Sequence, residues 1–189
     1  MKRFALVLVA LMVAGCLAAC SSSQSQKTDS GKQQIPNPME ESTQQGVIDA
    51  TGIDLPAPEG ATDVKYFIYM LDNPIAEMRF TLDGKQANLR AQATSLTDLA
   101  IDTSKAKSDQ ATYADIDISG MNYTWETIGT QIVKDRSALC FVAGKVGFIA
   151  WIDAAPGILY NLSMDDGASS ETLVQMAEAA FVPVQGDVK

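Results

Sequence analysis

Apolar and polar residues alternate most regularly between positions 75 and 94. Every second residue from Ala76 to Leu82 is apolar, and the same period continues over 85–94. Asp83-Gly84, which separates the two runs, is typical of a type I′ turn. The pattern predicts an antiparallel hairpin with one buried face and one face in water, the latter carrying Glu77, Arg79, Asn88, Arg90 and Gln92.

Further strand patterns lie on both sides of this hairpin. We expect strands at 64–71, near 116, at 121–128, 130–136, 138–143, 146–153 and 158–164, with a II′ turn at Gly144-Lys145. Residues 95–111 are polar and are expected to form a loop, with a short helix near 96–100 as an alternative.

Two helices are predicted at the ends of the strand-rich region. Ser42-Thr43-Gln44-Gln45 matches a capping box and Gly52 suits a helix C-cap, which predicts a helix over about 43–51. Ser169 or Ser170 is the expected N-cap of a second helix that runs to Phe181. Together these elements predict an α+β fold, an antiparallel meander of about 7–9 strands forming a curved sheet or half-barrel between a short N-terminal helix and a C-terminal helix.

The first twenty residues have the pattern of a secretory signal. Lys2 and Arg3 precede an apolar run that Gly15 interrupts and that ends at Cys20. This run is shorter than the about 20 apolar residues of a membrane span, so an uncleaved anchor is disfavoured. A charged start, a short apolar segment and a small-residue cleavage site indicate export.

A cysteine at the end of such a signal resembles the signals of bacterial lipoproteins, in which that cysteine is lipidated and becomes the mature N-terminus. Cys16 also fits this pattern, but cleavage there would leave apolar residues ahead of the polar tether, so Cys20 is favoured. We expect a signal peptide at 1–19 and a lipid-anchored protein on the extracytoplasmic face of the cell membrane or in the periplasm. The polar segment 20–38 is expected to be a flexible tether, 39–183 a single domain and 184–189 a tail.

Composition narrows the possible partners and chemistries. The chain has 14 Lys and Arg against 23 Asp and Glu, a net charge of −9, which disfavours nucleic acid as a partner. Acyl chains rather than charge would then hold the protein at a membrane. No histidine is present, which excludes Ser-His-Asp and Cys-His hydrolysis and histidine-bound zinc. No cofactor is expected. Cys140 lies in an apolar run and is expected to be a buried, inert thiol.

One segment matches the anchor positions of a calcium-binding EF-hand loop. Positions 1, 3, 5, 6 and 12 of that loop would be Asp115, Asp117, Ser119, Gly120 and Glu126. The acids alternate with isoleucines as in a strand, Asn122 stands where an aliphatic residue is normal, and neither flank is helical. A strand-turn-strand connection is therefore favoured over a metal site.

Three other groups of residues bear on function. Aromatic rings could line a groove for a sugar or peptide, although most are expected in the core: Tyr66, Tyr69, Tyr123, Trp125, Trp151 and Tyr160. The small inward residues Ala87, Ala91 and Ala93 leave room that the C-terminal helix, with Ala177 and Ala180, or an apolar ligand would fill. Three pairs of acids that are close in the sequence are expected to be solvated or turn residues: Glu40-Glu41, Asp115 with Asp117, and Asp165-Asp166.

The order of several short motifs carries a resemblance. These are Pro36-Asn37-Pro38-Met39, Thr51-Gly52, Leu55-Pro56, Ile75-Ala76-Glu77-Met78-Arg79, Asp117-Ile118-Ser119-Gly120 before Tyr123, and Ala150-Trp151-Ile152-Asp153. Over most of 36–181 this order resembles a widespread, uncharacterised domain of bacterial lipoproteins. That family has no established activity, so the resemblance implies no functional residue. It also resembles the open β-barrels of lipoprotein carriers at the level of fold.

The sequence therefore predicts a membrane-anchored, non-catalytic binding or interaction module, with an envelope protein or an apolar ligand as the partner class. One alternative is a carrier of lipids or other hydrophobic ligands, which requires a cavity between sheet and helix. The other is a carboxylate-based hydrolase, which requires two acids that converge in a cleft.

Overall fold

The computed structural model describes residues 39–107 and 109–183, which belong to one compact unit of the chain, Pro36–Lys189. The predicted signal peptide (1–19), lipidated Cys20, tether (20–38) and tail (184–189) lie outside the described residues.

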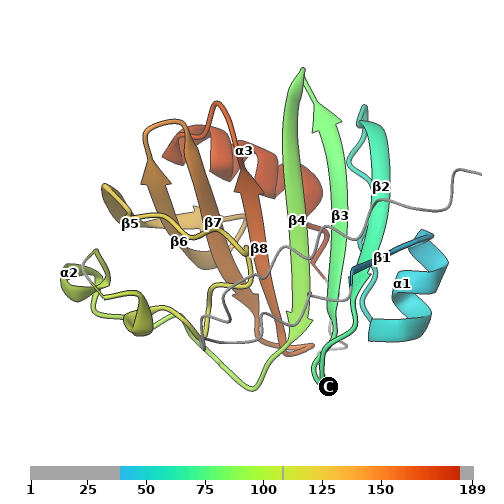
Figure 1. Ribbon diagram of the computed structural model, residues 1–189, viewed down its shortest axis with the longest axis horizontal. Coiled ribbons are helices and arrows are strands. Elements are labelled where there is room, and N and C mark those ends of the chain that lie inside the picture. The colour runs from blue at the N-terminus through green and yellow to red at the C-terminus, as the bar shows by residue number, and fades with distance from the viewer. Residues whose placement is uncertain (1–38, 108, 184–189) are drawn as a thin grey trace, which may run out of the picture. The chain divides into compact units, whose positions relative to one another are not determined.

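The fold is α+β, built on one antiparallel eight-stranded sheet (Figure 1). The strands are β1 (Met39–Ser42), β2 (Thr62–Tyr69), β3 (Ile75–Leu82), β4 (Lys85–Ala93), β5 (Thr127–Val133), β6 (Arg136–Ala143), β7 (Val146–Asp153) and β8 (Ile158–Met164). Their order in the sheet is β1-β2-β3-β4-β8-β7-β6-β5. The sheet is not closed, and the predicted antiparallel α+β class is confirmed.

The sheet consists of two meanders that meet at a central seam. β1 to β4 form the first, β5 to β8 form the second, and β4 pairs with β8 between them, Leu89 opposite Leu162. Residues 94–126 connect the end of β4 to the far edge at β5. The topology thus depends on pairing between strands that are far apart in the sequence.

Local turn chemistry forms the hairpins where the sequence predicts them. Asp83 and Gly84 both have positive φ, 51° and 72°, as a type I′ turn requires. Gly144 has φ 58° and Lys145 is not among the positive-φ residues, which suits the II′ turn between β6 and β7. Both predicted turns are confirmed.

Both predicted terminal helices are present. Helix α1 (Gln44–Thr51) ends at Gly52, whose φ of 72° is the left-handed C-cap. Its N-cap is Thr43 and not Ser42, because Ser42 pairs with Tyr66 in β1, which the sequence analysis did not predict. Helix α3 (Ser170–Ala180) has the predicted cap at Ser169 and ends before Phe181.

The strands predicted near 116 and at 121–128 are wrong. β5 begins only at Thr127, and the chain before it forms turns and irregular structure. The 95–111 segment is mostly loop, as expected, and contains α2 (Thr103–Ala106) and η1 (Gln110–Thr112) rather than a helix at 96–100. The strand predicted at 130–136 instead ends at 133, with its turn at 134–135.

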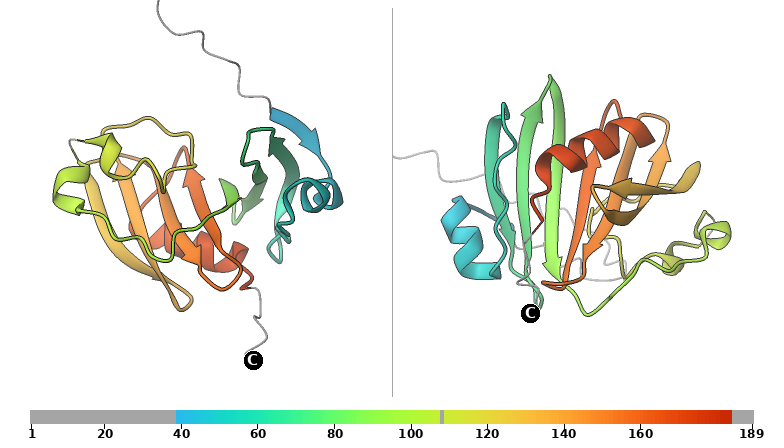
Figure 2. Two further views of the ribbon diagram at one scale, coloured as in Figure 1. Left: turned by 90° about the horizontal axis from the view of Figure 1, so that it is seen from below. Right: turned by 180° about the vertical axis from the view of Figure 1, so that it is seen from behind.

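Two hydrophobic clusters cover opposite faces of the sheet. On one face α1 and α3 pack against inward side chains that include Met78, Trp151 and Leu162. On the other face the 94–126 connection packs over the β5–β8 half, where Trp125 meets Phe148. Figure 1 shows α3 behind the strands and this connection in front of them, and the rear view in Figure 2 reverses the order.

The small residues of β4 lie under the helical face. Ala87 and Ala91 are buried in the same cluster as Ala177 and Ala180 of α3, and α3 contacts β4 as well as β5 to β8. The C-terminal helix therefore occupies the space above these alanines. Ala93, which was predicted to belong with them, is exposed at the end of the strand.

Candidate functional site

Polar and charged side chains replace the apolar layer on the β2–β4 half of the sheet, on the face opposite α3. The register places Phe67, Glu77, Arg90 and Asn161 in one row across β2, β3, β4 and β8. Further along the β8–β7–β6 direction the row becomes apolar with Ala150. The change from polar to apolar occurs where the 94–126 connection begins to cover the face.

Glu77 is the centre of a buried ion network. Its side chain is fully buried, and Arg79 and Arg90 each donate a hydrogen bond from Nε to one of its two carboxylate oxygens. The Tyr69 hydroxyl donates to the same oxygen as Arg90, over 3.0 Å, and accepts from Arg90 Nη2 over 2.6 Å. Burial raises the pKa of Tyr69, so this hydroxyl keeps its proton and remains a donor.

This burial corrects the expectation that Glu77 faces water. Alternation correctly assigned the face of the strand, but that face is covered at this position. A buried carboxylate is tolerated because two guanidinium groups and a hydroxyl occupy its lone pairs. The network therefore fixes the positions of both arginines.

Two cations stand directly opposite each other next to this network. Lys65 on β2 is the register partner of Arg79 on β3, and both side chains project from the same face. Within residues 39–107 and 109–183, Lys65 forms no ion pair, whereas Arg79 uses Nε for Glu77. Directly opposite like charges destabilise a sheet. Three positive charges, on Lys65, Arg79 and Arg90, therefore lie near the one buried carboxylate of Glu77, which pairs with both arginines and not with Lys65.

The Arg79 side chain is held in place from several sides. Its guanidinium lies over the Phe67 ring, 4.2 Å from the ring centroid, and Nη2 contacts the Met39 sulfur at 3.2 Å. The side chain is still 39% exposed. A guanidinium that is positioned but accessible is a preorganised donor for an anion.

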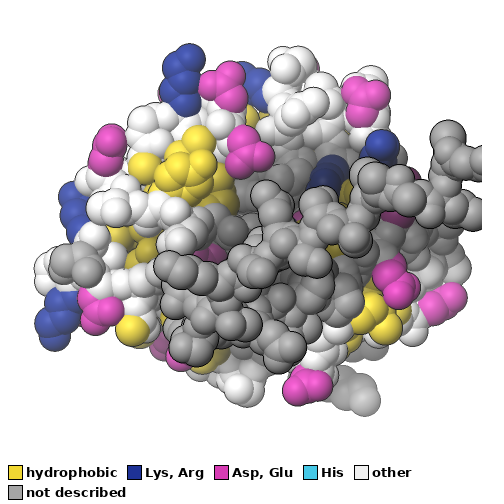
Figure 3. Space-filling view, in the orientation of Figure 1, with side chains coloured by type: hydrophobic (Ala, Val, Ile, Leu, Met, Phe, Trp, Pro, Cys, Tyr) yellow, Lys and Arg dark blue, Asp and Glu magenta, His cyan; other side chains and the backbone are white. Residues whose placement is uncertain are grey.

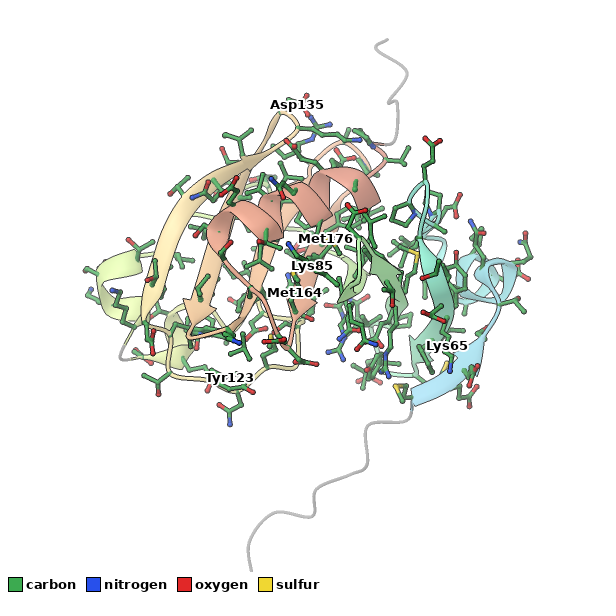
Figure 4. The ribbon with its side chains drawn as sticks, turned by 90° about the horizontal axis from the view of Figure 1, so that it is seen from above. Lys65, Lys85, Tyr123, Asp135, Met164 and Met176 are labelled. Atoms are coloured by element: carbon green, nitrogen blue, oxygen red, sulfur yellow. The ribbon has the colours of Figure 1, made fainter. Side chains whose placement is uncertain are left out.

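These residues line an open cleft of about 340 Å³. Its polar side chains come from three adjacent strands: the hydrogen-bond donors Lys65, Arg79, Thr81, Gln86 and Asn88, and one carboxylate, that of Asp63. Figure 3 shows basic side chains in a hollow over β3 and β4, and Figure 4 shows Lys65 on the side of the sheet away from α3. We call this group the basic cleft. Its donor set of ammonium, guanidinium, amide and hydroxyl groups suits an anionic ligand group.

A β-bulge shapes one wall of the basic cleft. The β2–β3 register shifts between Thr62 and Lys65, and Asp63, which also lines the cleft, has a φ of 53°. Bulges redirect side chains at functional edges of sheets. Lys65 follows directly after this irregularity.

The network also fastens the 94–126 connection to the sheet. Arg90 Nη1 donates to the Ile118 carbonyl over 2.9 Å, and Asn161 Oδ1 accepts from the Ile118 amide over 3.1 Å. Asn161 Nδ2 donates to the Ile116 carbonyl over 3.0 Å. The backbone of Ile116 and Ile118 therefore forms hydrogen bonds with side chains of the sheet, where a strand would bond to the backbone of its neighbour.

The calcium-like pattern lies at this attachment, and its oxygens have other partners. Asp117 Oδ1 accepts from the amide and hydroxyl of Ser119, and Glu126 Oε2 accepts from the Gly144 amide over 3.2 Å. Asp115 is exposed. Within the described part of the chain, no group of three or more acids or cysteines is placed to hold a metal ion.

The two fully buried acids among the described residues are not paired with each other. The two fully buried acids, Glu77 and Asp153, lie on opposite faces of the sheet, and each is paired with an arginine. Asp165 and Asp166 are exposed in a turn, with Asp166 3.7 Å from Lys145. Glu40 and Glu41 are exposed on β1.

Most of the predicted aromatic set belongs to the core. Trp125, Trp151 and Tyr160 are buried, Tyr69 serves the ion network, and Tyr66 is half-buried. Only Tyr123 among the six is exposed, and Figure 4 shows it at the surface on the face away from α3. The set forms no continuous groove, as expected for core residues. Cys140 is buried, and burial raises the pKa of its thiol.

Sequence analysis did not identify the basic cleft. It placed Glu77 and Arg79 together on one face but treated that face as solvated. The two-residue turn at Asp83-Gly84 fixes the register that sets Glu77 opposite Arg90. Opposite charges at directly paired positions, Glu77 and Arg90, were therefore the sequence feature that could have indicated an ion pair here.

No helix in residues 39–107 and 109–183 has both the length and the apolar character needed to cross a bilayer. Comparisons of the chain with protein-family models, with curated proteins and with solved structures found no match.

Proposed function

We propose that this protein is a lipid-anchored, extracytoplasmic and non-catalytic binding module that recognises an anionic group, a carboxylate or a phosphate, in the basic cleft. The observation that carries the proposal is the direct opposition of Lys65 and Arg79 at the wall of that cleft.

The energetics of the cleft favour an anion. Directly opposite like charges disfavour the empty site by about 0.2–1 kcal/mol, and a bound anion would turn this repulsion into two attractions. Glu77 cannot serve as that anion for Lys65, because its two oxygens already accept from Arg79, Arg90 and Tyr69. The neighbouring Asn88 and Gln86 add neutral donors.

The compartment is inferred from the N-terminal pattern. A short apolar segment that ends at Cys20, followed by a polar tether, supports export and lipidation, and two acyl chains give stable attachment. An acidic protein gains little from anionic head groups. Lipid would therefore place the module at the membrane, and the basic cleft would select its ligand.

The cleft can be tested by ligand-dependent stability. Thermal unfolding of the detergent-solubilised full chain is followed by tryptophan fluorescence in inorganic phosphate, in acetate and in chloride of equal ionic strength. We expect phosphate or acetate to raise the melting temperature of the native protein, because a ligand that binds only the folded state stabilises it.

Lys65→Met separates the two roles of the lysine. This variant should be slightly more stable than the native protein in chloride, since the repulsion from Arg79 is removed, yet it should lose stabilisation by the anion. Lys107→Met, which removes an exposed lysine far along the connection, is the control and should change neither property. Equal stabilisation of the native and Lys65→Met proteins by every anion would refute the proposal.

The anchor has its own test. Bacteria expressing the full chain are fed an alkyne-bearing fatty acid, and the purified product is analysed for label. We expect labelled native protein and labelled Cys16→Ala, but unlabelled Cys20→Ala. Label that survives in Cys20→Ala would contradict lipidation at position 20.

A further inference from the structure

A second cleft, of about 390 Å³, lies on the helical side of the sheet and is independent of the proposed function. Its walls come from the end of α1, the α1–β2 connector, the adjoining ends of β4 and β8, and the chain after α3. We call it the end cleft. Its volume is in the range of small-molecule sites.

Apolar side chains form most of the end cleft. Ile53 from the connector and Ile158 from β8 line it as buried side chains, whereas Val182 after α3 is 58% exposed although its neighbour Phe181 is buried. A short hydrocarbon chain would bury surface here that is now in contact with water.

The one formal charge and the helix end at the end cleft are both negative. Asp54 is its one ionisable acid, and no lysine or arginine lines it among the described residues. Thr51 and Gly52, also in the wall, form the C-terminal end of α1, where the helix dipole is negative. The last turn of α1 contains no basic residue to neutralise that end.

Tyr160 contributes a neutral hydroxyl to the same wall. Its ring stacks on Trp151 with centroids 5.3 Å apart and meets Phe181 edge-on at 5.2 Å, which fixes its position. Burial, reinforced by the negative charges of Asp153 and Asp54, raises the pKa of Tyr160 to about 12. The hydroxyl therefore keeps its proton at neutral pH.

Asp153 extends the negative environment into the core. It is fully buried, and Arg136 donates to its Oδ1 over 3.1 and 3.2 Å. Its Oδ2 has no hydrogen-bond partner within the described part of the chain. Only one oxygen of this carboxylate is paired, and its negative charge contributes to the raised pKa of Tyr160.

We propose that the end cleft binds a small organic ammonium ion with a short hydrocarbon chain. The ammonium group would bind Asp54 and the carbonyl end of α1, while the chain packs against Ile53, Ile158 and Val182. A metal cation fits less well, because one carboxylate among apolar walls provides too few oxygens. A carboxylate or phosphate ligand would be repelled by Asp54 and the helix end.

The probe is n-butylammonium, compared with its neutral and anionic analogues n-pentanol and pentanoate. The full chain, labelled at isoleucine methyl groups and held in detergent, is titrated with each compound and observed by NMR. Ile53 and Ile158 line the end cleft, and Ile128 and Ile132 on β5 serve as internal controls. Signals are assigned with single Ile→Val variants.

We expect n-butylammonium to shift the Ile53 and Ile158 methyl signals saturably, with at least about tenfold higher affinity than either analogue. Asp54→Asn should reduce n-butylammonium affinity about tenfold without changing that of n-pentanol. The matched control is Asp49→Asn: the Asp49 carboxylate accepts from Gln45 as that of Asp54 accepts from Gln44, but Asp49 does not line the end cleft, so binding should be unchanged.

Two results would overturn the proposal. One is equal affinity for n-butylammonium and n-pentanol, or no effect of Asp54→Asn. The other is an equal response of Ile128 and Ile132, which would indicate unspecific attraction of cations to an acidic protein. Because Lys65 and Arg79 take no part, neither result bears on the basic cleft.

Discussion

Glu77 and Arg90 face each other across β3 and β4, and they form an ion pair in which the carboxylate is fully buried and the guanidinium is 14% exposed. Removing one partner of a buried pair leaves an uncompensated charge, which is more harmful than the loss of the attraction itself. The pair is therefore expected to be indispensable to the first meander.

Glu77→Ala should lower the free energy of unfolding by about 3–5 kcal/mol, because Arg79, Arg90 and Tyr69 all lose their shared acceptor. Urea unfolding of the full chain, followed by tryptophan fluorescence, measures the change. Asp166→Ala breaks an exposed pair with Lys145 and should have no measurable effect. Similar losses in the two variants would show that Glu77 is not buried in solution.

Gly120 should not tolerate a side chain. A Cβ there would lie 2.6 Å from Arg90 Nη1, and the residue has a φ of 74°. Gly84 has a φ of 72° but open space around it, so Gly84→Ala measures the backbone penalty alone. We expect Gly120→Ala to be the more destabilising, by about 1–3 kcal/mol in urea unfolding, because Arg90 must release the Ile118 carbonyl. Equal penalties would mean that Arg90 moves freely.

Asp117 should make stability depend on pH in the acid range. Burial raises its pKa, although hydrogen bonds from Ser119 oppose the shift. The native state then retains a proton that the unfolded chain has lost at its ordinary pKa of about 3.9. The stability of the native protein relative to Asp117→Asn should fall as the pH rises through this value and level off above the folded pKa.

The control for this titration is Asp115→Asn, which changes an exposed acid two positions away. Urea unfolding at acid and neutral pH measures all three proteins. Asp117→Asn should be the more stable at neutral pH and Asp115→Asn should follow the native protein. The opposite trend, with native stability rising relative to Asp117→Asn, would contradict a raised pKa.

The Cys140 thiol should be unreactive in the folded protein. It is 1% exposed, and burial raises its pKa, which lowers the thiolate fraction at any given pH. A full chain with Cys16 and Cys20 changed to Ser isolates this thiol. Its alkylation by iodoacetamide at pH 8 should be at least about 1,000-fold slower than in urea, since access requires unfolding. Comparable rates would show an accessible thiol.

The hairpin over 75–94 could be predicted because its information is local. Two-residue alternation sets the faces, and Asp83-Gly84 sets the register. The same is true of the caps at Gly52 and Ser169, each of which depends on a single residue. The N-cap is Thr43 rather than the predicted Ser42 because Ser42 belongs to β1, a strand of four residues that is too short to give a recognisable sequence pattern.

The 113–125 segment could not be predicted from its alternating pattern. A strand needs a free neighbour, and the edge of β4 is taken by β8. Ile116 and Met121 instead bury themselves on the sheet face, with Asn161 and Arg90 satisfying part of the backbone. The burial of Glu77 also depends on contacts between segments that are far apart in the sequence. For this reason sequence analysis did not identify the basic cleft.

The seam between β4 and β8 has a consequence for how the protein is made. β4 is complete early in synthesis, whereas its partner β8 is the last strand to leave the ribosome. Until then the amide and carbonyl groups along that side of β4 are unpaired and can form hydrogen bonds with strands of other chains. A product cut short before residue 158 should aggregate, and the growing chain should need protection by a chaperone until its final hairpin has emerged.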